Sequence, residues 1–511
     1  MTNALRSALV RLPAIVALVY ATALAAAAQG ASSCRNLYRL TDLQHAIEPG
    51  IRVEATDELP TYCRVRGVIN RAIRFEVTLP EAWNGRLMFE AVGGSAGVIG
   101  DTTSLLDRGF AQASTDTGHE FAEGNDFVKQ PEALLDYAYR GVHLATRASK
   151  RVIAHYYGRD IDHAYLQGCS NGGRAAMLEA ARFPEDYDGI IAGAPAFQFQ
   201  EFMPWMVAVG RRQAAHPLDR AALEVLDDAS RSACDALDGV IDGVINDPRI
   251  CRLDLDSLVC AEGESKGCLS AGQLETARFI YEDMIGADGN VQSPGVPPGA
   301  EAAGDWGGWI LRNEALADAG GSIVGDLIPE MLTFLMRHDA EFKIDEFDPV
   351  GDYESLADPL TPLDLRTADL SEFRDRGGKL LIYQGWNDFP LRPQRAIAYL
   401  ESVEQAMGGA DATADFFRMF MVPGMVHCAG GPGAWEADYV DPLVKWTEQG
   451  EAPERIVATH PGPTEFDHLD AEARAGQDRT FTRPLCAYPK LAQYDGEGDP
   501  DNETNFRCAA P

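Results

Sequence analysis

The segment YLQGCSNGGRAAMLEAARFP, residues 165–184, constrains the fold of this chain more than any other. It places Ser170 between Gly168 and Gly172, after a short apolar run and before a helix-like segment that Pro184 ends. A G-x-S-x-G turn between a strand and a helix is tight and strained, and it exposes the serine hydroxyl at the C-terminal edge of a sheet. The segment therefore indicates a serine nucleophile, and a glycine-rich helix cap is the alternative.

The spacing of apolar residues on both sides of this turn predicts alternating strands and helices. Residues 66–94 alternate short apolar runs with turns, residues 132–158 have helical spacing, and residues 189–196 form a buried strand. The α/β pattern resumes at residues 377–388 and continues to about residue 450. Such alternation predicts a mostly parallel sheet with helices on both faces.

The pattern changes between these two α/β segments. Residues 197–367 are richer in glycine, acidic residues and irregular stretches than the segments beside them. We therefore predict one α/β domain, formed by residues 29–196 and 368–511, with residues 197–367 inserted as a second domain. The insert follows the nucleophile segment in the chain, which is where a lid over the active site could sit.

The N-terminus has the composition of a secretory signal peptide. Arg6 and Arg11 give it a basic start, residues 12–27 are largely apolar, and Ala-x-Ala patterns precede residue 29. The apolar run is short for a membrane span, although an uncleaved anchor is the alternative. We expect residues 1–28 to be removed and the protein to be secreted, extracellular or periplasmic, without stable membrane association.

The chain is strongly acidic. Its 511 residues include 78 Asp and Glu against 44 Lys and Arg, for a formal net charge of −34. A surface this negative repels nucleic acid and anionic membranes and favours cation binding. We therefore expect no nucleic-acid partner.

A nucleophilic serine needs a base, and the base needs an orienting acid. After a turn of this kind, the acid and then the histidine follow the serine in chain order. Asp388 follows a predicted strand at residues 379–383, and His427 lies in a glycine-rich loop near the end of the domain. Ser170, Asp388 and His427 are the candidate catalytic residues; a turn aspartate and a surface-loop histidine are the alternatives.

An oxyanion formed at the serine needs hydrogen-bond donors. One is expected to be the backbone N–H of Asn171 at the start of the helix. The other should come from an early strand–loop segment, FEAVGGSAG at residues 89–97, where Gly93 or Gly94 is the candidate. A plain turn is the alternative for this segment.

Ten cysteines in an exported chain indicate disulfide bonds. Proximity in the sequence suggests four pairs: Cys34–Cys63, Cys234–Cys251, Cys260–Cys268 and Cys486–Cys508. Cys169 and Cys428 remain, next to Ser170 and His427. A bond between them would tie the nucleophile loop to the base loop, and two unrelated buried cysteines are the alternative.

Four segments together resemble the tannase and feruloyl esterase family over nearly the whole mature chain. They are GCSNGG at 168–173, CDALDGVIDGVINDPRIC at 234–251, YQGWND at 383–388 and RMFMVPGMVHCAGGPG at 418–433. The resemblance implies an α/β-hydrolase fold with a large inserted lid domain, a Ser170–His427–Asp388 triad, and a disulfide between Cys169 and Cys428. The chain departs from the family at Gln384, where histidine is frequent, and in the FPLRP stretch after Asp388.

An acidic loop in the insert has the composition of a calcium site. Asp235, Asp238 and Asp242 lie close together with glycines between them. By pattern alone, a solvated acidic turn is the alternative. The resemblance implies a structural Ca²⁺ bound by these three side chains and by the backbone carbonyls of Val240 and Val244.

The resemblance also implies the reaction, which is hydrolysis of carboxylic esters of aromatic acids of the feruloyl, caffeoyl or galloyl type. A terephthalate monoesterase, or another serine hydrolase or acyltransferase of the same fold, is the first alternative. A non-catalytic secreted calcium-binding recognition protein is the remote one. Four large residues of the insert are candidates for the acyl pocket, although each is more simply core: Trp306, Trp309, Met331 and Phe334.

Overall fold

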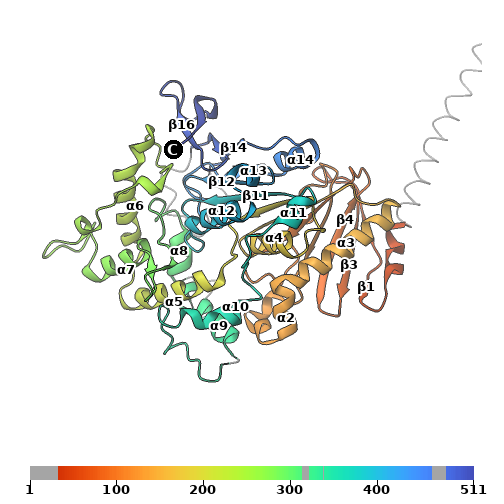
Figure 1. Ribbon diagram of the computed structural model, residues 1–511, viewed down its shortest axis with the longest axis horizontal. Helices are drawn as coiled ribbons and strands as arrows, with labels where there is room; N and C mark the ends of the chain where they lie inside the picture. The colour runs from red at the N-terminus through yellow and green to blue at the C-terminus, as the bar shows by residue number, and fades with distance from the viewer. Residues whose placement is uncertain (1–32, 313–320, 338, 463–478) are drawn as a thin grey trace, which may run out of the picture.

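The computed structural model describes residues 33–312, 321–337, 339–462 and 479–511 (Figure 1). The predicted signal peptide, residues 1–28, lies outside these ranges. In the part of the chain that is described, no helix is both long and apolar enough to cross a membrane.

Ten strands form the central sheet. Its order is β1-β3-β4-β6-β5-β7-β8-β11-β12, and β2 pairs with β3. From β6 to β12 every neighbouring pair is parallel, whereas β1 to β4 pair antiparallel and β4 joins β6 antiparallel. The strands are β1 His45–Ile47, β2 Ile51–Val53, β3 Tyr62–Ile69, β4 Ile73–Pro80, β5 Arg86–Ala91, β6 Ala111–Thr115, β7 His163–Cys169, β8 Gly189–Gly193, β11 Lys379–Gly385 and β12 Phe417–Val422.

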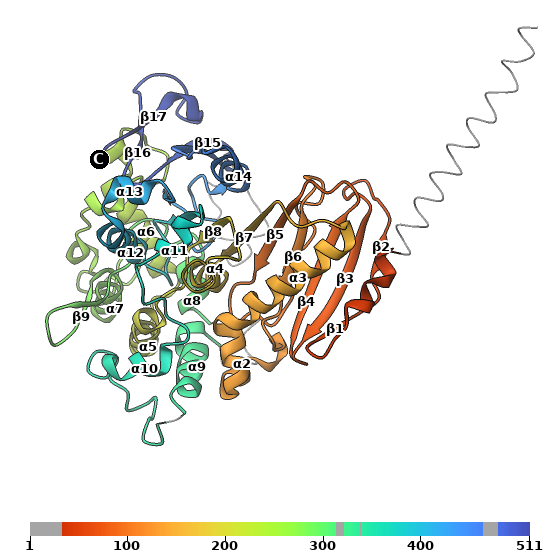
Figure 2. The same cartoon turned by 45° about the vertical axis from the view of Figure 1, so that its right-hand side comes forward.

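The parallel part of the sheet confirms the prediction from strand–helix alternation. Its side chains alternate between two cores, as a strand requires when both faces are buried. Leu166 and Ile190 belong to the core under α3, α4 and α12, whereas Tyr165 and Ile191 belong to the core under α14. These helices are α3 Gly141–Tyr157, α4 Asn171–Arg182, α12 Pro393–Met407 and α14 Val440–Gln449, and Figure 2 shows α3 lying along the N-terminal strands.

The helix expected over residues 132–158 is interrupted. The structure has α2 (Pro131–Leu135), a π-helical turn at Asp136–Arg140, and then α3. The guanidinium of Arg174, fully buried on α4, donates to the carbonyl oxygens of Tyr137 and Ala138 at 2.9 and 2.7 Å. An arginine from a different helix therefore binds carbonyls of the π turn, a tertiary contact that apolar spacing does not reveal.

The insert between β8 and β11 forms a further hydrophobic core, which it shares with buried residues from before β7 such as Phe127 and Tyr137. Trp205, Trp306 and Leu332 are buried there, and Phe389 from the loop after β11 joins them. Figure 1 shows these elements grouped beside the C-terminal half of the sheet. They are α5 Phe199–Ala215, α6 Arg220–Cys234, α7 Ala271–Tyr281, β9 Met284–Ile285, β10 Val291–Ser293, α8 Asp305–Ile310, α9 Ile328–Leu335 and α10 Ala357–Leu360. The boundaries at 197 and 367 stay predictions.

After the insert, α14 and the C-terminal strands β14 and β15 pack on the second face of the sheet, whereas α11 packs with α4 and α12 on the first. A small antiparallel sheet, β13-β14-β15, packs with α14 in the same core, and β16 pairs with β17. The remaining elements are α11 Ser371–Asp375, α13 Ala410–Ala414, β13 Glu436–Ala437, β14 Arg455–His460, β15 Phe481–Cys486, β16 Leu491–Tyr494 and β17 Phe506–Ala509.

All five predicted disulfide pairs are confirmed. They are Cys34–Cys63, Cys169–Cys428, Cys234–Cys251, Cys260–Cys268 and Cys486–Cys508. Four of them join residues that are near in sequence. The fifth, Cys169–Cys428, joins the end of β7 to the loop after β12 across a sequence separation of 259.

We expect Arg174→Met to lower the free energy of unfolding by about 3 kcal/mol, because it removes two buried hydrogen bonds from a charged donor at about 1.5–3 kcal/mol each. Urea denaturation followed by circular dichroism measures this loss. Arg182→Met, an exposed position on the same helix, is the matched control and should change stability by no more than about 0.5 kcal/mol. Equal stability of the two variants would contradict the role assigned to Arg174.

Candidate active site

Ser170 occupies the strained turn between β7 and α4. Its φ of 60° and ψ of −122° lie in a region that non-glycine residues rarely adopt. The turn is possible because its glycines allow close backbone approach: a Cβ on Gly172 would lie 2.1 Å from Ala91 O, and one on Gly173 2.4 Å from Gly193 O. The strand–turn–helix predicted for this segment is therefore present, with Ser170 at its apex.

The side chains of Asp388 and His427 meet at the same edge of the sheet. His427 Nδ1 lies 2.9 Å from Asp388 Oδ2, and the aspartate side chain is fully buried. Gln384 Nε2 donates to the same oxygen at 3.0 Å, and the Leu391 N–H donates to Asp388 Oδ1 at 2.8 Å. Asp388 is therefore held in place by two further donors besides the histidine.

Gln384 is a site residue that sequence reasoning noted only as a departure from the family pattern. It is the sixth residue of β11, is buried, and also donates from Nε2 to the Leu391 carbonyl at 3.1 Å. Its signal in the sequence was its position four residues before the candidate acid. A neutral amide there can orient the carboxylate without adding a charge.

The disulfide Cys169–Cys428 brings the serine turn and the base loop together. Its two Cα atoms lie 6.0 Å apart, and Ser170 and His427 are the residues next to the two cysteines. Among the described residues, no hydrogen bond joins Ser170 Oγ to the imidazole, whose Nε2 lies 3.8 Å from Cys428 Sγ. Bonds between nucleophile and base are often long without substrate and shorten in the complex.

Two opposing effects set the pKa of His427. Burial lowers the pKa of the imidazole, while the charge and hydrogen bond of Asp388, together with the charge of Asp305, raise it. The net result is a pKa above the ordinary value of histidine. A histidine in this state is a stronger base, and its protonated form is stabilised by the neighbouring carboxylates.

Of the two glycine candidates for the oxyanion site, Gly93 lies beside the nucleophile. A Cβ on Gly93 would be 3.7 Å from the Cβ of Ser170, whereas one on Gly94 would have no atom within 4 Å. Asn171 is the first residue of α4, so its backbone N–H has no acceptor within the helix. Its side chain donates to the Val92 carbonyl at 3.1 Å and so ties this turn to the glycine loop.

The insert anchors the loop that carries Asp388. The buried Arg392 guanidinium pairs with Glu201 of α5 at 2.5 Å and donates to Ser293 Oγ at 2.9 Å. Asn387 Nδ2 donates to the Pro298 carbonyl at 3.2 Å. The FPLRP stretch that departs from the family pattern therefore supplies an ion pair between the acid loop and the insert.

Of the four large insert residues considered for a pocket, Trp309 lies at the candidate triad. Its ring centroid is 6.1 Å from that of His427, at an interplanar angle of 80°. Trp306 and Met331 are buried in the core of the insert, and the Phe334 ring contacts the Lys129 ammonium at 3.8 Å. The core interpretation therefore holds for Trp306 and Met331, while Trp309 contacts the base.

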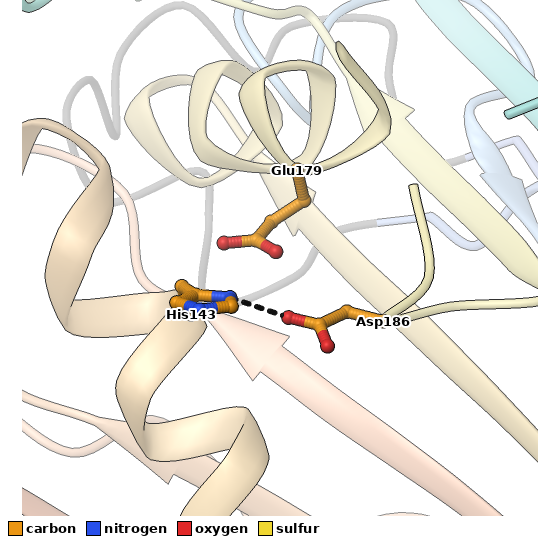
Figure 3. Close-up of side chains that lie close together, drawn as sticks. All are labelled: His143, Glu179 and Asp186. Atoms are coloured by element: carbon orange, nitrogen blue, oxygen red, sulfur yellow. Dashed lines mark hydrogen bonds and ion pairs between the residues drawn. The ribbon is translucent and has the colours of Figure 1, made fainter. Parts of the chain in front are cut away.

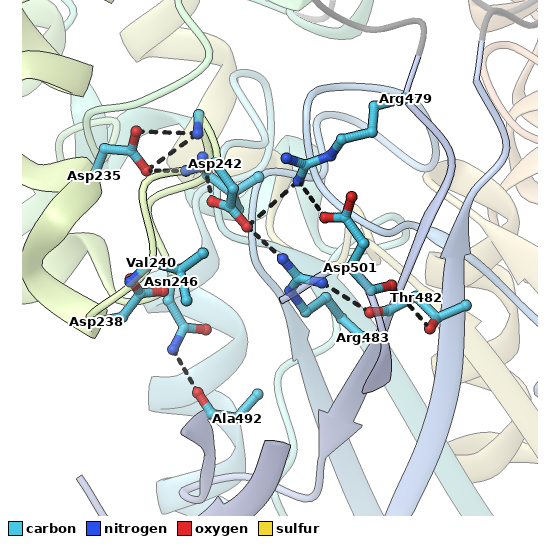
Figure 4. A network of polar contacts seen from close by, with 12 residues as sticks. Asp235, Asp238, Val240, Asp242, Asn246, Arg479, Thr482, Arg483, Ala492 and Asp501 are labelled. Carbon is cyan, nitrogen blue, oxygen red and sulfur yellow. Dashed lines mark hydrogen bonds and ion pairs between the residues drawn. The ribbon is translucent and has the colours of Figure 1, made fainter. Parts of the chain in front are cut away.

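The three candidate calcium ligands Asp235, Asp238 and Asp242 lie on one loop of the insert (Figure 4). Asp235 accepts the backbone N–H groups of Asp242 and Gly243, which curls the loop around it. Burial raises the pKa of Asp238 to about 6, and the charges of Asp242 and Asp235 add to the effect. Carboxylate and carbonyl oxygens are the ligands that Ca²⁺ prefers in proteins, and a divalent cation would offset the repulsion between neighbouring carboxylates.

The same loop is tied to the C-terminal strands. Arg483 of β15 donates to Asp242 Oδ2 at 2.5 Å, and Arg479 lies 3.8 Å from that oxygen and 3.3 Å from Asp501. Asp242 Oδ1 accepts the Val244 N–H at 3.1 Å. The loop therefore connects the insert to the second half of the α/β domain.

A second group of metal-ligating side chains lies behind the nucleophile helix (Figure 3). His143 Nδ1 of α3 is 2.6 Å from Asp186 Oδ2, and the buried carboxylate of Glu179 on α4 points toward them. The Lys150 ammonium donates to the Asp186 backbone carbonyl and lies 4.0 Å from Asp186 Oδ1. The contacts of His143 and Lys150 with Asp186 therefore link α3 to the segment that follows α4.

We expect Cys169→Ala/Cys428→Ala to lower the free energy of unfolding by about 5 kcal/mol, because the lost crosslink closes a very long loop. We also expect slower labelling of Ser170 by a fluorophosphonate at a temperature where the variant is folded, because the serine and the base lose their register. Cys260→Ala/Cys268→Ala, which opens a short loop elsewhere, is the control. Equal labelling rates for the two variants would show that the crosslink serves stability alone.

Comparisons with known proteins place the chain in a family. The model of the family described as tannase and feruloyl esterase matches residues 58–509. A mono(2-hydroxyethyl) terephthalate hydrolase from Piscinibacter sakaiensis is 34% identical over 89% of this chain and 85% of its own length. A probable feruloyl esterase B-2 from Neosartorya fischeri is 29% identical over 87% and 86%.

The solved structures agree on the fold. The crystal structure of an esterase from Aspergillus oryzae aligns with a TM-score of 0.81 at 24% identity, over 94% of this chain and 99% of that one. This likeness and the sheet order confirm the α/β-hydrolase fold. The chain belongs to the tannase and feruloyl esterase family of carboxylic ester hydrolases.

Proposed function

We propose that this protein is a secreted serine esterase that hydrolyses esters of aromatic carboxylic acids through Ser170, His427 and Asp388. The observation that carries the proposal is the hydrogen bond between His427 and the buried Asp388, in a loop that the Cys169–Cys428 disulfide ties to the turn of Ser170. Five disulfides in the described chain support an oxidising compartment, as do residues 1–28 with their signal-peptide composition.

In the first half of the reaction, His427 Nε2 takes the proton of Ser170 Oγ as the oxygen attacks the ester carbonyl carbon. The carbonyl oxygen becomes an oxyanion, which the backbone N–H groups of Asn171 and Gly93 would stabilise. Asp388 holds the imidazole through Nδ1 and stabilises the imidazolium that forms. The bond from the carbonyl carbon to the alcohol oxygen then breaks, and His427 returns the proton to the leaving alcohol.

In the second half, water attacks the acyl group bound to Ser170. His427 takes a proton from the water and passes it to Ser170 Oγ as the carbon–oxygen bond to the serine breaks. The products are one carboxylic acid and one alcohol for each ester and water consumed. The strained backbone of Ser170 is the same at the start and end of this cycle.

The acid part of the substrate is the finer part of the proposal. The names of the relatives include a feruloyl esterase and a terephthalate monoester hydrolase, and both names refer to an aromatic acid. Trp309 presents an aromatic surface beside the base. We therefore propose a feruloyl, caffeoyl or galloyl ester as the substrate class, with a terephthalate monoester as the second candidate because of the 34% identity to that hydrolase.

A substrate panel tests this proposal: methyl ferulate, methyl caffeate, methyl gallate, mono(2-hydroxyethyl) terephthalate and a short aliphatic ester. We expect kcat/KM to be highest for one aromatic ester, and Ser170→Ala to lower it by about 10⁴-fold or more, because the nucleophile is lost. Ser402→Ala, an exposed serine on α12, is the matched control and should keep full activity.

Each other result of this panel selects a different function. Preference for the aliphatic ester would keep the esterase and refute the aromatic specificity. Amide hydrolysis or acyl transfer faster than ester hydrolysis would indicate another serine hydrolase or an acyltransferase. A folded protein in which a fluorophosphonate does not label Ser170 would favour the non-catalytic recognition protein.

We also propose that the acidic loop binds a structural Ca²⁺. Asp235, Asp238 and Asp242 would supply carboxylate oxygens, and Val240 and Val244 backbone carbonyls. The ion would neutralise the carboxylates and fix the loop between the insert and β15. This proposal rests on the oxygen donor set of the loop.

Removal of calcium should therefore destabilise the protein. We expect dialysis against EGTA to lower the free energy of unfolding by about 2.7 kcal/mol relative to protein in Ca²⁺ at a hundred times its Kd, and added Ca²⁺ to restore it. Asp238→Asn should lose most of this calcium response, whereas Asp254→Asn, an exposed acid of the insert, should keep it. Differential scanning calorimetry measures the effect, and a melting temperature that is the same in EGTA and in Ca²⁺ would refute the site.

A further inference from the structure

Asp305 is a buried carboxylate of the insert that contacts both the base loop and the acid loop. It is the first residue of α8. Its Oδ2 accepts the backbone N–H groups of Phe389 at 3.0 Å and His427 at 3.2 Å, and its Oδ1 accepts Trp309 Nε1 at 3.0 Å. None of the sequence motifs includes this residue.

Through these hydrogen bonds Asp305 links the loop of Asp388 to the loop of His427. Asp305 Oδ2 accepts the backbone N–H of His427 and the backbone N–H of Phe389, the residue that follows Asp388. The relative position of the two loops is therefore fixed by a side chain from outside both of them. The bond from Trp309 in turn fixes the Asp305 carboxylate.

The charge of Asp305 acts on the same imidazole as the charge of Asp388. Burial raises the pKa of Asp305 to about 6, and the nearby charge of Asp388 adds to the effect, while His427 and the two backbone donors oppose it. Among the described residues, the charged groups that act on His427 are Asp388 and Asp305. An imidazolium formed at His427 therefore has two carboxylates beside it.

We propose that Asp305 is a positioning residue of the active site, which orders the His427 loop and electrostatically stabilises the imidazolium formed during catalysis. The proposal rests on the assignment of His427 as the base. Because Asp305 belongs to the insert, the base is fully ordered only while α8 is seated against it. Through Asp305 the insert would therefore contribute to catalysis.

Asp305→Asn tests the proposal because it keeps the size of the side chain and removes its charge. The amide oxygen can still accept the two backbone N–H groups, while the amide nitrogen faces Trp309 Nε1, and two donors then oppose each other. The double variant Asp305→Asn/Trp309→Phe removes that conflict and is the variant to use where the single one does not fold. Trp309→Phe alone keeps the charge of Asp305, and comparison with it separates the effect of the lost charge from that of the lost indole.

We expect Asp305→Asn and the double variant to lower kcat about tenfold, with a smaller change in KM, because the base is less well placed. We also expect the acid limb of the kcat/KM profile to move to lower pH by about half a unit. Loss of a negative charge lowers the pKa of His427, so the imidazole becomes neutral, and active, at a lower pH. Trp309→Phe and Asp352→Asn, an exposed acid of the insert, should leave the acid limb in place.

Three results would contradict the role of Asp305 or the assignment of His427 on which it rests. A loss of kcat with an unmoved acid limb would overturn the proposal, because a merely structural residue lowers activity without changing the pKa of the base. Wild-type kcat and an unchanged profile in Asp305→Asn would overturn it while leaving the esterase assignment intact. Wild-type protein without Ser170-dependent ester hydrolysis would refute the assignment of the base itself.

Discussion

The bond between Cys169 and Cys428 is the constraint on which the rest of the candidate site depends. In the sheet, β7 and β12 are separated by β8 and β11, and in the chain they are separated by the whole insert. Parallel pairing brings the C-terminal ends of these strands to one edge, but loops at such an edge are free to diverge. The disulfide removes that freedom for Ser170 and His427, the two residues that exchange a proton in the proposed mechanism, and the strained turn at Ser170 fixes one of the two loops.

The third member of the site depends on packing from the insert. Asp388 lies in a loop that Arg392 joins to Glu201, a charge pair buried on both sides. A buried pair is costly to break because each ion left alone has lost its hydration. The loop therefore cannot leave the insert without exposing two charges, and the insert acts as a scaffold for the acid. The side chain of Asp305 extends this arrangement from the acid to the base.

The sequence was sufficient for features whose signal is local. The glycines around Ser170 predicted the turn, the periodicity around it predicted the parallel strands, and chain order selected Asp388 and His427. Asp305 has no such signal, because its partners Phe389 and His427 lie 84 and 122 residues away. Gln384 was visible only as an unexpected residue, and the sequence did not reveal that Gly93, rather than Gly94, lies beside Ser170. These are tertiary contacts between residues that lie far apart in the sequence, so no short sequence pattern reveals them.

The charges around His427 also indicate why two carboxylates are useful in one buried site. With the imidazole neutral, Asp388 and Asp305 repel each other, and the raised pKa of Asp305 reflects that repulsion together with its burial. In the proposed mechanism the imidazole takes the serine proton, and the positive charge that forms is attracted by both carboxylates, which offsets the repulsion. The interaction is thus stronger in the charged transition state than in the resting enzyme, and only such a difference accelerates the chemical step. Asp388 alone would stabilise the imidazolium with one charge. Asp305 adds a second charge, which its hydrogen bonds to two backbone N–H groups hold in place, and it takes no part in proton transfer.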